Sequence, residues 1–134
     1  MQKFPVAEKI YIKISKIPNS GRGVYAKADI KKGEIIEQCP IIEIPKHDTA
    51  NLTESILITY FFYFGANRQR QAIALGFGSL YNHTRKPNAV YKIKPAESRI
   101  DFTALEDIKK DDEITINYSP EPQKDKNPLW FEVA

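Results

Sequence analysis

At 134 residues with 42% hydrophobic side chains, the chain can bury one core and is too short for two domains of ordinary size. Its single cysteine, Cys39, excludes an internal disulfide and a cysteine-rich zinc cluster, so we predict no metal site. The basic side chains behind the net charge of +3 are dispersed rather than set in one stripe, so we expect no direct contact with nucleic acid.

Nothing in the chain predicts a membrane span or a secretory leader. The longest apolar run, residues 56–66, is far short of the roughly 20 residues that cross a bilayer. Residues 1–5 lack the apolar core of a signal peptide. We therefore expect a soluble, intracellular protein that does not bind a membrane.

The first predicted element is a strand over residues 9–14, whose isoleucines alternate onto one face. It leads to a turn in which Gly21 and Gly23 let the backbone approach a ligand, because no Cβ stands in the way. Taken alone, this Gly-x-Gly-x-x-Ala pattern also matches a dinucleotide fingerprint, which should follow a strand and open a helix. Pro-Asn-Ser precedes the turn and Gly33 breaks any such helix, so that alternative is disfavoured.

The segments 29–35 and 107–114 share one pattern, a polar turn between an isoleucine and a new strand. In the first, Gly33 can adopt a positive φ without steric penalty. In the second, Asp111 and Asp112 can hydrogen-bond to their own backbone. Both segments predict the same bend with the isoleucine buried, although two copies do not make a repeat architecture.

The remaining elements are mostly β. A short helix is expected to begin at Asn51 or Thr53, ahead of a β-prone run at 59–64. The side chains that this helix should turn inward are Leu52, Ile56 and Leu57. Residues 90–93 and 100–104 predict a hairpin. The prolines of 119–128 deny that segment helix or ladder pairing, so we expect an extended connector to a short terminal element.

Two segments carry the most information: Tyr81-Asn82-His83-Thr84-Arg85-Lys86-Pro87-Asn88 and Asp112-Glu113-Ile114-Thr115-Ile116-Asn117-Tyr118. An Asn-His pair, a Pro-Asn that fixes the turn into the next strand, and a strand that ends in tyrosine resemble the SET-domain protein lysine methyltransferases. The glycine turn at 21–26 and the strand turn at 30–37 resemble that family's N-terminal pieces and stand in the family's order. The family usually has serine after the histidine, where Thr84 keeps the hydroxyl.

The resemblance implies a mostly β fold, the SET-domain fold of several small sheets with short helices and a knot-like C-terminal threading. In that arrangement the C-terminal strand lies near the Asn82-His83 loop. Residues 1–134 would form a single SET domain, minimal and zinc-free like viral and bacterial stand-alone members, with 119–134 as a connector and pocket-closing segment. The implied reaction is transfer of a methyl group from S-adenosylmethionine to the ε-amine of a lysine in a protein substrate, histones included.

That reaction requires a neutral lysine amine, although the unperturbed pKa of lysine is about 10.4. Desolvation and the positive charge of the sulfonium both lower that pKa, and an apolar channel aligns nitrogen with methyl and excludes water. Neither a metal nor a nucleophilic side chain is needed. The lack of a Ser/His/Asp constellation therefore does not count against the resemblance.

By resemblance, Tyr118 is the catalytic residue, with its hydroxyl near the sulfur and the methyl group. Asn82 would bind the amino-acid end of the cofactor, and the His83 backbone would pair with the adenine edge while its side chain holds the loop. Tyr118 could instead be a half-buried tyrosine at the end of a strand, and His83 could be a structural histidine. The presence of both motifs together favours the catalytic interpretation. The other expected cofactor-binding residues are Gly21, Arg22, Gly23 and Trp130, although Trp130 could instead pin the tail to the core.

The lysine channel should be aromatic, and three positions stand where the family has channel walls: Tyr91, Ile116 and Cys39. Packing is the plainer role for the Cys39 thiol. The expected partner is a protein or peptide lysine substrate, added as a strand at an exposed sheet edge. The acidic residues of 101–134 could attract a lysine-rich substrate, although solvated turns are the plainer interpretation of most of these charges.

A homodimer is a further suggestion, since a domain this small gains core by association. The alternative from another class is a non-catalytic SET-like module that binds peptides or regulates a partner. Calorimetric titration with S-adenosylmethionine separates the two, since a pure peptide reader should show no heat.

Overall fold

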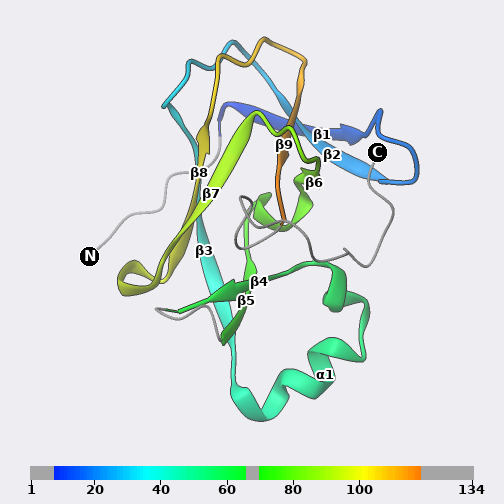
Figure 1. The fold of residues 1–134 in the computed structure, drawn as a ribbon, viewed down its shortest axis with the longest axis vertical. Coiled ribbons are helices and arrows are strands. Elements are labelled where there is room, and N and C mark those ends of the chain that lie inside the picture. Colours follow the sequence, from blue (N-terminus) through cyan, green and yellow to red (C-terminus); the bar gives the residue numbers. More distant parts are fainter. Residues whose placement is uncertain (1–7, 66–69, 119–134) are drawn as a thin grey trace.

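The computed structural model describes residues 8–65 and 70–118, which form two small sheets joined by turns and short helices (Figure 1). The strands are β1 (Ile10–Ile14), β2 (Arg22–Ala26), β3 (Ile35–Ile44), β4 (Phe61–Phe64), β5 (Arg70–Ala74), β6 (Asn82–His83), β7 (Ala89–Lys94), β8 (Arg99–Ala104) and β9 (Glu113–Ile116). The helical elements are α1 (Thr49–Thr53) and the 3-10 turns η1 (Lys46–Asp48), η2 (Ile56–Thr59), η3 (Gly78–Leu80) and η4 (Pro95–Glu97). The described part of the chain is mostly β, as predicted.

The last described strand lies inside the smaller sheet, whose strand order is β1-β2-β9-β6. The larger sheet has the order β4-β5-β3-β8-β7. β9 pairs antiparallel with β2 and parallel with β6, so the C-terminal strand runs beside the Asn-His segment, as the resemblance predicted. The predicted connector and pocket-closing segment, 119–134, lies outside the described residues.

β7 and β8 form the predicted antiparallel hairpin, in which Ile93 faces Ile100. Ser98 closes its turn in the left-handed region at φ 52°. The N-terminal strand is also confirmed as β1, which pairs with β2. Burial along β1 fades from Ile10 to Ile14, which is 77% exposed, because β9 continues the sheet only beside the other end of β2.

The two similar turns adopt the predicted bend. Ile30 and Ile108 are both buried and bridge to each other. Gly33 and Asp111 occupy the left-handed region at φ 85° and φ 70°. Each turn is also capped by the other, because an aspartate at the start of one accepts a backbone N–H from the other at 2.8 Å. The caps are Asp107 for the N–H of Lys32 and Asp29 for that of Lys110.

The helix prediction was wrong in its start and in the side chains that it buries. α1 begins at Thr49, ahead of both expected caps, and buries Leu52. Ile56 and Leu57 are 75% and 42% exposed instead of facing the core. The Ser55 side chain accepts from the Leu57 N–H and starts a separate 3-10 turn, which breaks the helical spacing from Leu52. The β-prone run that follows forms β4, as expected.

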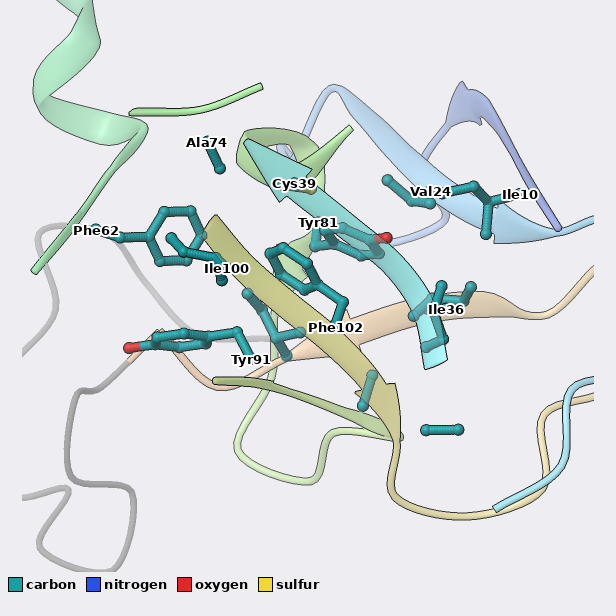
Figure 2. Packing of buried hydrophobic residues seen from close by; sticks show 14 of the residues in the cluster. Ile10, Val24, Ile36, Cys39, Phe62, Ala74, Tyr81, Tyr91, Ile100 and Phe102 are labelled. Atoms are coloured by element: carbon teal, nitrogen blue, oxygen red, sulfur yellow. The ribbon is translucent and has the colours of Figure 1, made fainter. Parts of the chain in front are cut away.

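The core is formed by side chains of both sheets, with β3 and β8 of the larger sheet and β2 and β9 of the smaller sheet contributing to it (Figure 2). The Tyr81 and Phe102 rings stack at its centre, 4.4 Å apart, with Cys39 beside them. Phe62 packs edge-on against Tyr91 at 5.0 Å. Tyr81, which ends the turn before the Asn-His pair, is therefore anchored in the centre of the protein.

Several apolar side chains stay exposed in the part of the chain from β3 to β5, among them Ile42, Ile56 and Tyr63. This part, with α1, lies at the opposite end from the β1–β2 hairpin (Figure 1). The suggested homodimer stays a prediction. No helix in residues 8–65 and 70–118 has both the length and the apolar character that a membrane crossing needs.

Candidate active site

The Asn-His motif and the strand that leads to Tyr118 lie side by side. β6 and β9 pair in parallel, with Asn82 opposite Thr115 and His83 opposite Ile116. Asn82 and His83 are buried, with 8% and 4% of their surface exposed. Sheet pairing therefore joins two motifs that are far apart in the sequence into one site.

Tyr118 is held on both sides by the segment 81–83. Its hydroxyl donates to the main-chain carbonyl oxygen of Tyr81 at 2.5 Å. Its backbone N–H donates to Nδ1 of His83 at 2.9 Å, and the two rings lie 5.1 Å apart. The His83 side chain thus fixes the chain where it leaves β9, and Tyr118 is placed against the residue that precedes Asn82.

Burial raises the pKa of Tyr118 above its usual value, and Tyr60 and Glu113 nearby raise this pKa further. The hydroxyl therefore stays protonated around neutral pH and acts as a hydrogen-bond donor rather than as a base. A neutral phenol suits the orienting role expected from the sequence. That role stays a prediction.

The orientation of the Asn82 amide is set by the protein. Among the described residues, the hydrogen bonds of this side chain are both donated by Nδ2, to the Arg22 carbonyl oxygen at 3.0 Å and to Glu113 Oε2 at 2.8 Å. With both amide hydrogens engaged, Oδ1 is the atom left to accept from a ligand. An ammonium group, such as that at the amino-acid end of S-adenosylmethionine, fits this acceptor.

Glu113 is a site residue that the sequence analysis missed. Its carboxylate accepts from Ser15 Oγ at 2.7 and 2.9 Å, from the Tyr25 hydroxyl at 3.4 Å, and from Asn82 Nδ2. Because Ser15 and Tyr25 come from the N-terminal segments, this one carboxylate ties them to the Asn-His segment. Its signal in the sequence is an acidic residue at the start of an alternating strand, which does not identify partners 98 and 31 residues away.

The glycine turn lies against the same carboxylate. A Cβ on Gly23 would collide with Glu113 Oε2 and would lie 3.0 Å from Asn82 Nδ2, so packing within the protein already requires glycine there. Gly21 has φ +65° and a Cβ there would meet nothing within 4 Å. The structure thus brings Arg22 and Gly23 to Asn82 and leaves open space at Gly21. Contact of these residues with the cofactor stays a prediction.

Asn88 has the structural role expected for the Pro-Asn pair. Its Nδ2 donates to the Glu113 carbonyl oxygen, and the Thr115 N–H donates to its Oδ1, both at 2.9 Å. Both ends of the amide are therefore bound to the backbone of β9. This clamp holds the strand that carries Glu113 and leads to Tyr118.

The three channel candidates lie in different surroundings. The Tyr91 hydroxyl donates to the Tyr118 carbonyl oxygen at 3.5 Å, and Ile116 is buried opposite His83. Cys39 is fully buried in the core, where burial and the neighbouring Glu37 charge raise the pKa of its thiol, so it stays protonated and suits packing. Trp130 lies outside the described residues, and its role stays a prediction.

A family model described as the SET domain matches residues 21–119. The chain is 29% identical over 121 residues to a Schizosaccharomyces pombe protein named histone-lysine N-methyltransferase, H3 lysine-37 specific, and the match covers 90% of this chain and 77% of that protein. The crystal structure of a candidate histone methyltransferase from Plasmodium falciparum is 34% identical, with a TM-score of 0.66 over 86% of this chain and 96% of that chain.

A structure of polycomb repressive complex 2 from Chaetomium thermophilum, in complex with H3K27me3 and H3K27M, has a TM-score of 0.68 at 25% identity. That match covers 87% of this chain and 15% of the other, so the resemblance concerns one part of a much longer protein.

The family match runs from the glycine turn through Asn82 and His83 to Tyr118, and the fold agrees with the solved structures. These matches therefore favour an enzyme over the alternative of a non-catalytic SET-like module. The chain belongs to the SET domain family, and it is a protein-lysine N-methyltransferase whose methyl donor is S-adenosylmethionine.

Proposed function

We propose that the chain methylates a lysine of a histone and that Tyr118 and Asn82 carry its chemistry and its cofactor binding. The names of the Schizosaccharomyces pombe and Plasmodium falciparum proteins support a histone as the substrate class. A nuclear location goes with such a substrate. The observation that carries the assignment of roles is the hydrogen bond from the Tyr118 hydroxyl to the carbonyl that precedes Asn82, because it sets the catalytic candidate against the cofactor motif.

In this proposal Asn82 Oδ1 accepts from the amino group of the cofactor, while Glu113 and the Arg22 carbonyl oxygen hold the other end of the amide. S-adenosylmethionine supplies an electrophilic methyl group on a positively charged sulfur. Tyr118, protonated and fixed on the Tyr81 carbonyl oxygen, uses its phenolic oxygen to align the reacting groups. Alignment of this kind supplies much of the rate of a displacement reaction.

The substrate lysine must lose its proton to solvent before it attacks, because the proposed mechanism contains no residue that acts as its base. Below the pKa of that amine, turnover should therefore rise with pH. Tyr118 does not interrupt this rise around neutral pH, because burial holds its pKa above the usual value. Tyr91 and Ile116, both buried, are the proposed channel walls that keep water from the amine.

The test is incubation of histone tail peptides with labelled S-adenosylmethionine, followed by mass spectrometry of the modified residue. The controls are the same peptides with lysine replaced by arginine, and the Tyr118→Phe enzyme. We expect a methylated lysine in at least one histone peptide, none in the arginine peptides, and labelling by Tyr118→Phe that is slower by about 100-fold or more. Labelling confined to lysines of non-histone proteins would contradict the substrate class, and undiminished labelling by Tyr118→Phe would contradict the catalytic assignment.

A further inference from the structure

Glu37 is the buried carboxylate of a strand whose other polar residues, Gln38 and Glu43, are not buried. It lies in β3 with 6% of its surface exposed. Burial of an ionised carboxylate is unfavourable unless hydrogen bonds compensate it. Glu37 accepts two, from the Tyr81 hydroxyl at 2.8 Å and from the Phe77 N–H at 2.9 Å. Both donors belong to the segment that leads into the Asn-His motif.

That segment is folded around the carboxylate. Gly76 adopts φ +63°, and a Cβ there would lie 2.5 Å from Glu37 Oε2. The next residue supplies the Phe77 N–H, and the η3 turn then carries the chain to Tyr81. The path of residues 76–81 is therefore set by its contacts with Glu37.

Tyr81 connects this buried carboxylate to the reaction site. Its ring stacks on Phe102 at 4.4 Å and its hydroxyl reaches Glu37, so the side chain is fixed at both its face and its tip. Its main-chain carbonyl oxygen accepts the Tyr118 hydroxyl at 2.5 Å. A shift of the Tyr81 side chain would therefore move the acceptor that orients Tyr118.

We propose that Glu37 and the Tyr81 hydroxyl are positioning residues for methyl transfer, which act by fixing the carbonyl oxygen that holds the Tyr118 hydroxyl. This inference rests on the proposed catalytic role of Tyr118. Small errors in the placement of a catalytic group reduce the rate without loss of substrate binding. The Glu37–Tyr81 pair thus supports the rate of methyl transfer. Glu113, with its partners Ser15, Tyr25 and Asn82, supports cofactor binding.

Tyr81→Phe is the decisive variant because it keeps the ring stacked on Phe102 and removes the contact with Glu37. Tyr11→Phe is the matched control, since it also removes a tyrosine hydroxyl that donates to a carboxylate at 2.8 Å, that of Asp111 on the surface turn. Both variants should be measured for kcat, for KM of S-adenosylmethionine and for melting temperature. We expect Tyr81→Phe to lower kcat about tenfold with KM changed less than about twofold, and Tyr11→Phe to leave both parameters unchanged.

A double variant separates positioning from a general structural role. If Tyr81 acts through Tyr118, the Tyr81→Phe, Tyr118→Phe enzyme should be no slower than Tyr118→Phe in single-turnover assays with excess enzyme. A further decrease in the double variant, or a wild-type kcat in Tyr81→Phe beside an impaired Tyr118→Phe, overturns the inference alone. A wild-type kcat in Tyr118→Phe overturns the catalytic assignment and the inference together.

Discussion

Two carboxylates organise the site from opposite sides, and they differ in their surroundings. Glu113 is half-buried in the smaller sheet and gathers side chains from the N-terminal segments and the Asn-His segment. Glu37 is buried in the larger sheet and accepts hydrogen bonds from Phe77 and Tyr81, in the segment that precedes the motif. In the proposed function, Glu113 supports Asn82, the proposed cofactor ligand, and Glu37 supports the placement of Tyr118.

This difference leads us to expect that the two carboxylates affect different steps, cofactor binding and methyl transfer. Glu113 accepts from Asn82 Nδ2 and thereby leaves Oδ1 for the proposed contact with the cofactor. Glu37 engages the Tyr81 hydroxyl and thereby fixes the carbonyl that holds Tyr118. Changes at the first carboxylate should therefore weaken cofactor binding, and changes at the second should slow the methyl transfer.

The largest effect is expected from Tyr118→Phe, which keeps a buried ring and removes the hydroxyl that bonds to Tyr81. We expect kcat to fall about 100-fold or more, as is typical when a transition-state hydrogen-bonding group is removed. The affinity for S-adenosylmethionine, measured by calorimetry, should change little. A loss of affinity that matches the loss of turnover would break the proposed division.

Glu113→Gln should weaken S-adenosylmethionine binding about tenfold, which corresponds to about 1.4 kcal/mol. The new NH2 group cannot accept, so one acceptor oxygen remains for the Asn82, Ser15 and Tyr25 donors and the hold on the Asn82 amide weakens. The matched control is Asp112→Asn, the exposed neighbouring carboxylate on the same turn. Equal affinities for Glu113→Gln and the wild type in calorimetric titration would remove Glu113 from the site.

Gly78→Ala should destabilise the protein through the core beside Glu37. A Cβ at this position would lie 2.6 Å from Ala74 Cβ and 2.8 Å from Cys39 Sγ. Overpacking of this kind costs about 1–3 kcal/mol, measurable as a lower free energy of unfolding in urea. An unchanged free energy of unfolding would show that the Glu37 side of the molecule is packed more loosely than the structure indicates.

The smallest effect is a gradual loss of stability in alkali, mostly from the Glu37 side. Burial raises the pKa values of Cys39, Tyr81 and Tyr118 in the folded protein. In the unfolded chain the pKa is about 8.5 for cysteine and about 10 for tyrosine. The contribution to stability is therefore complete below about pH 8.5 and is lost as the pH rises. Urea unfolding should show this decline in the free energy of unfolding, and Cys39→Ala should remove the part of the decline that begins near the cysteine pKa. Equal free energies of unfolding at about pH 8 and about pH 10 would contradict the prediction.

Much of the architecture was predictable because its signals are local. The two polar turns, the β7–β8 hairpin and the strand that ends near Tyr118 each follow from turn residues and alternation within a short segment. The Asn-His pairing with β9 followed only from family resemblance, since nothing local joins the two segments. Ile56 and Leu57 were misplaced because a serine cap restarts the chain after α1.

The two carboxylates were missed for a physical reason. Glu113 and Glu37 are defined by hydrogen bonds to residues such as Ser15 and Tyr81, at sequence separations of 98 and 44. No periodicity encodes such partners. The sequence does not single out Glu37, because Gln38 and Glu43 lie in the same strand without being buried.

The division between binding and turnover is tested most directly by measuring, in Glu113→Gln and Tyr81→Phe side by side, the dissociation constant for S-adenosylmethionine and kcat at saturating cofactor. The account predicts opposite patterns. Glu113→Gln should bind the cofactor about tenfold more weakly with kcat changed less than about twofold, and Tyr81→Phe should show the reverse. If both variants alter affinity and kcat in the same proportion, the two carboxylates support one undivided site and the account is contradicted.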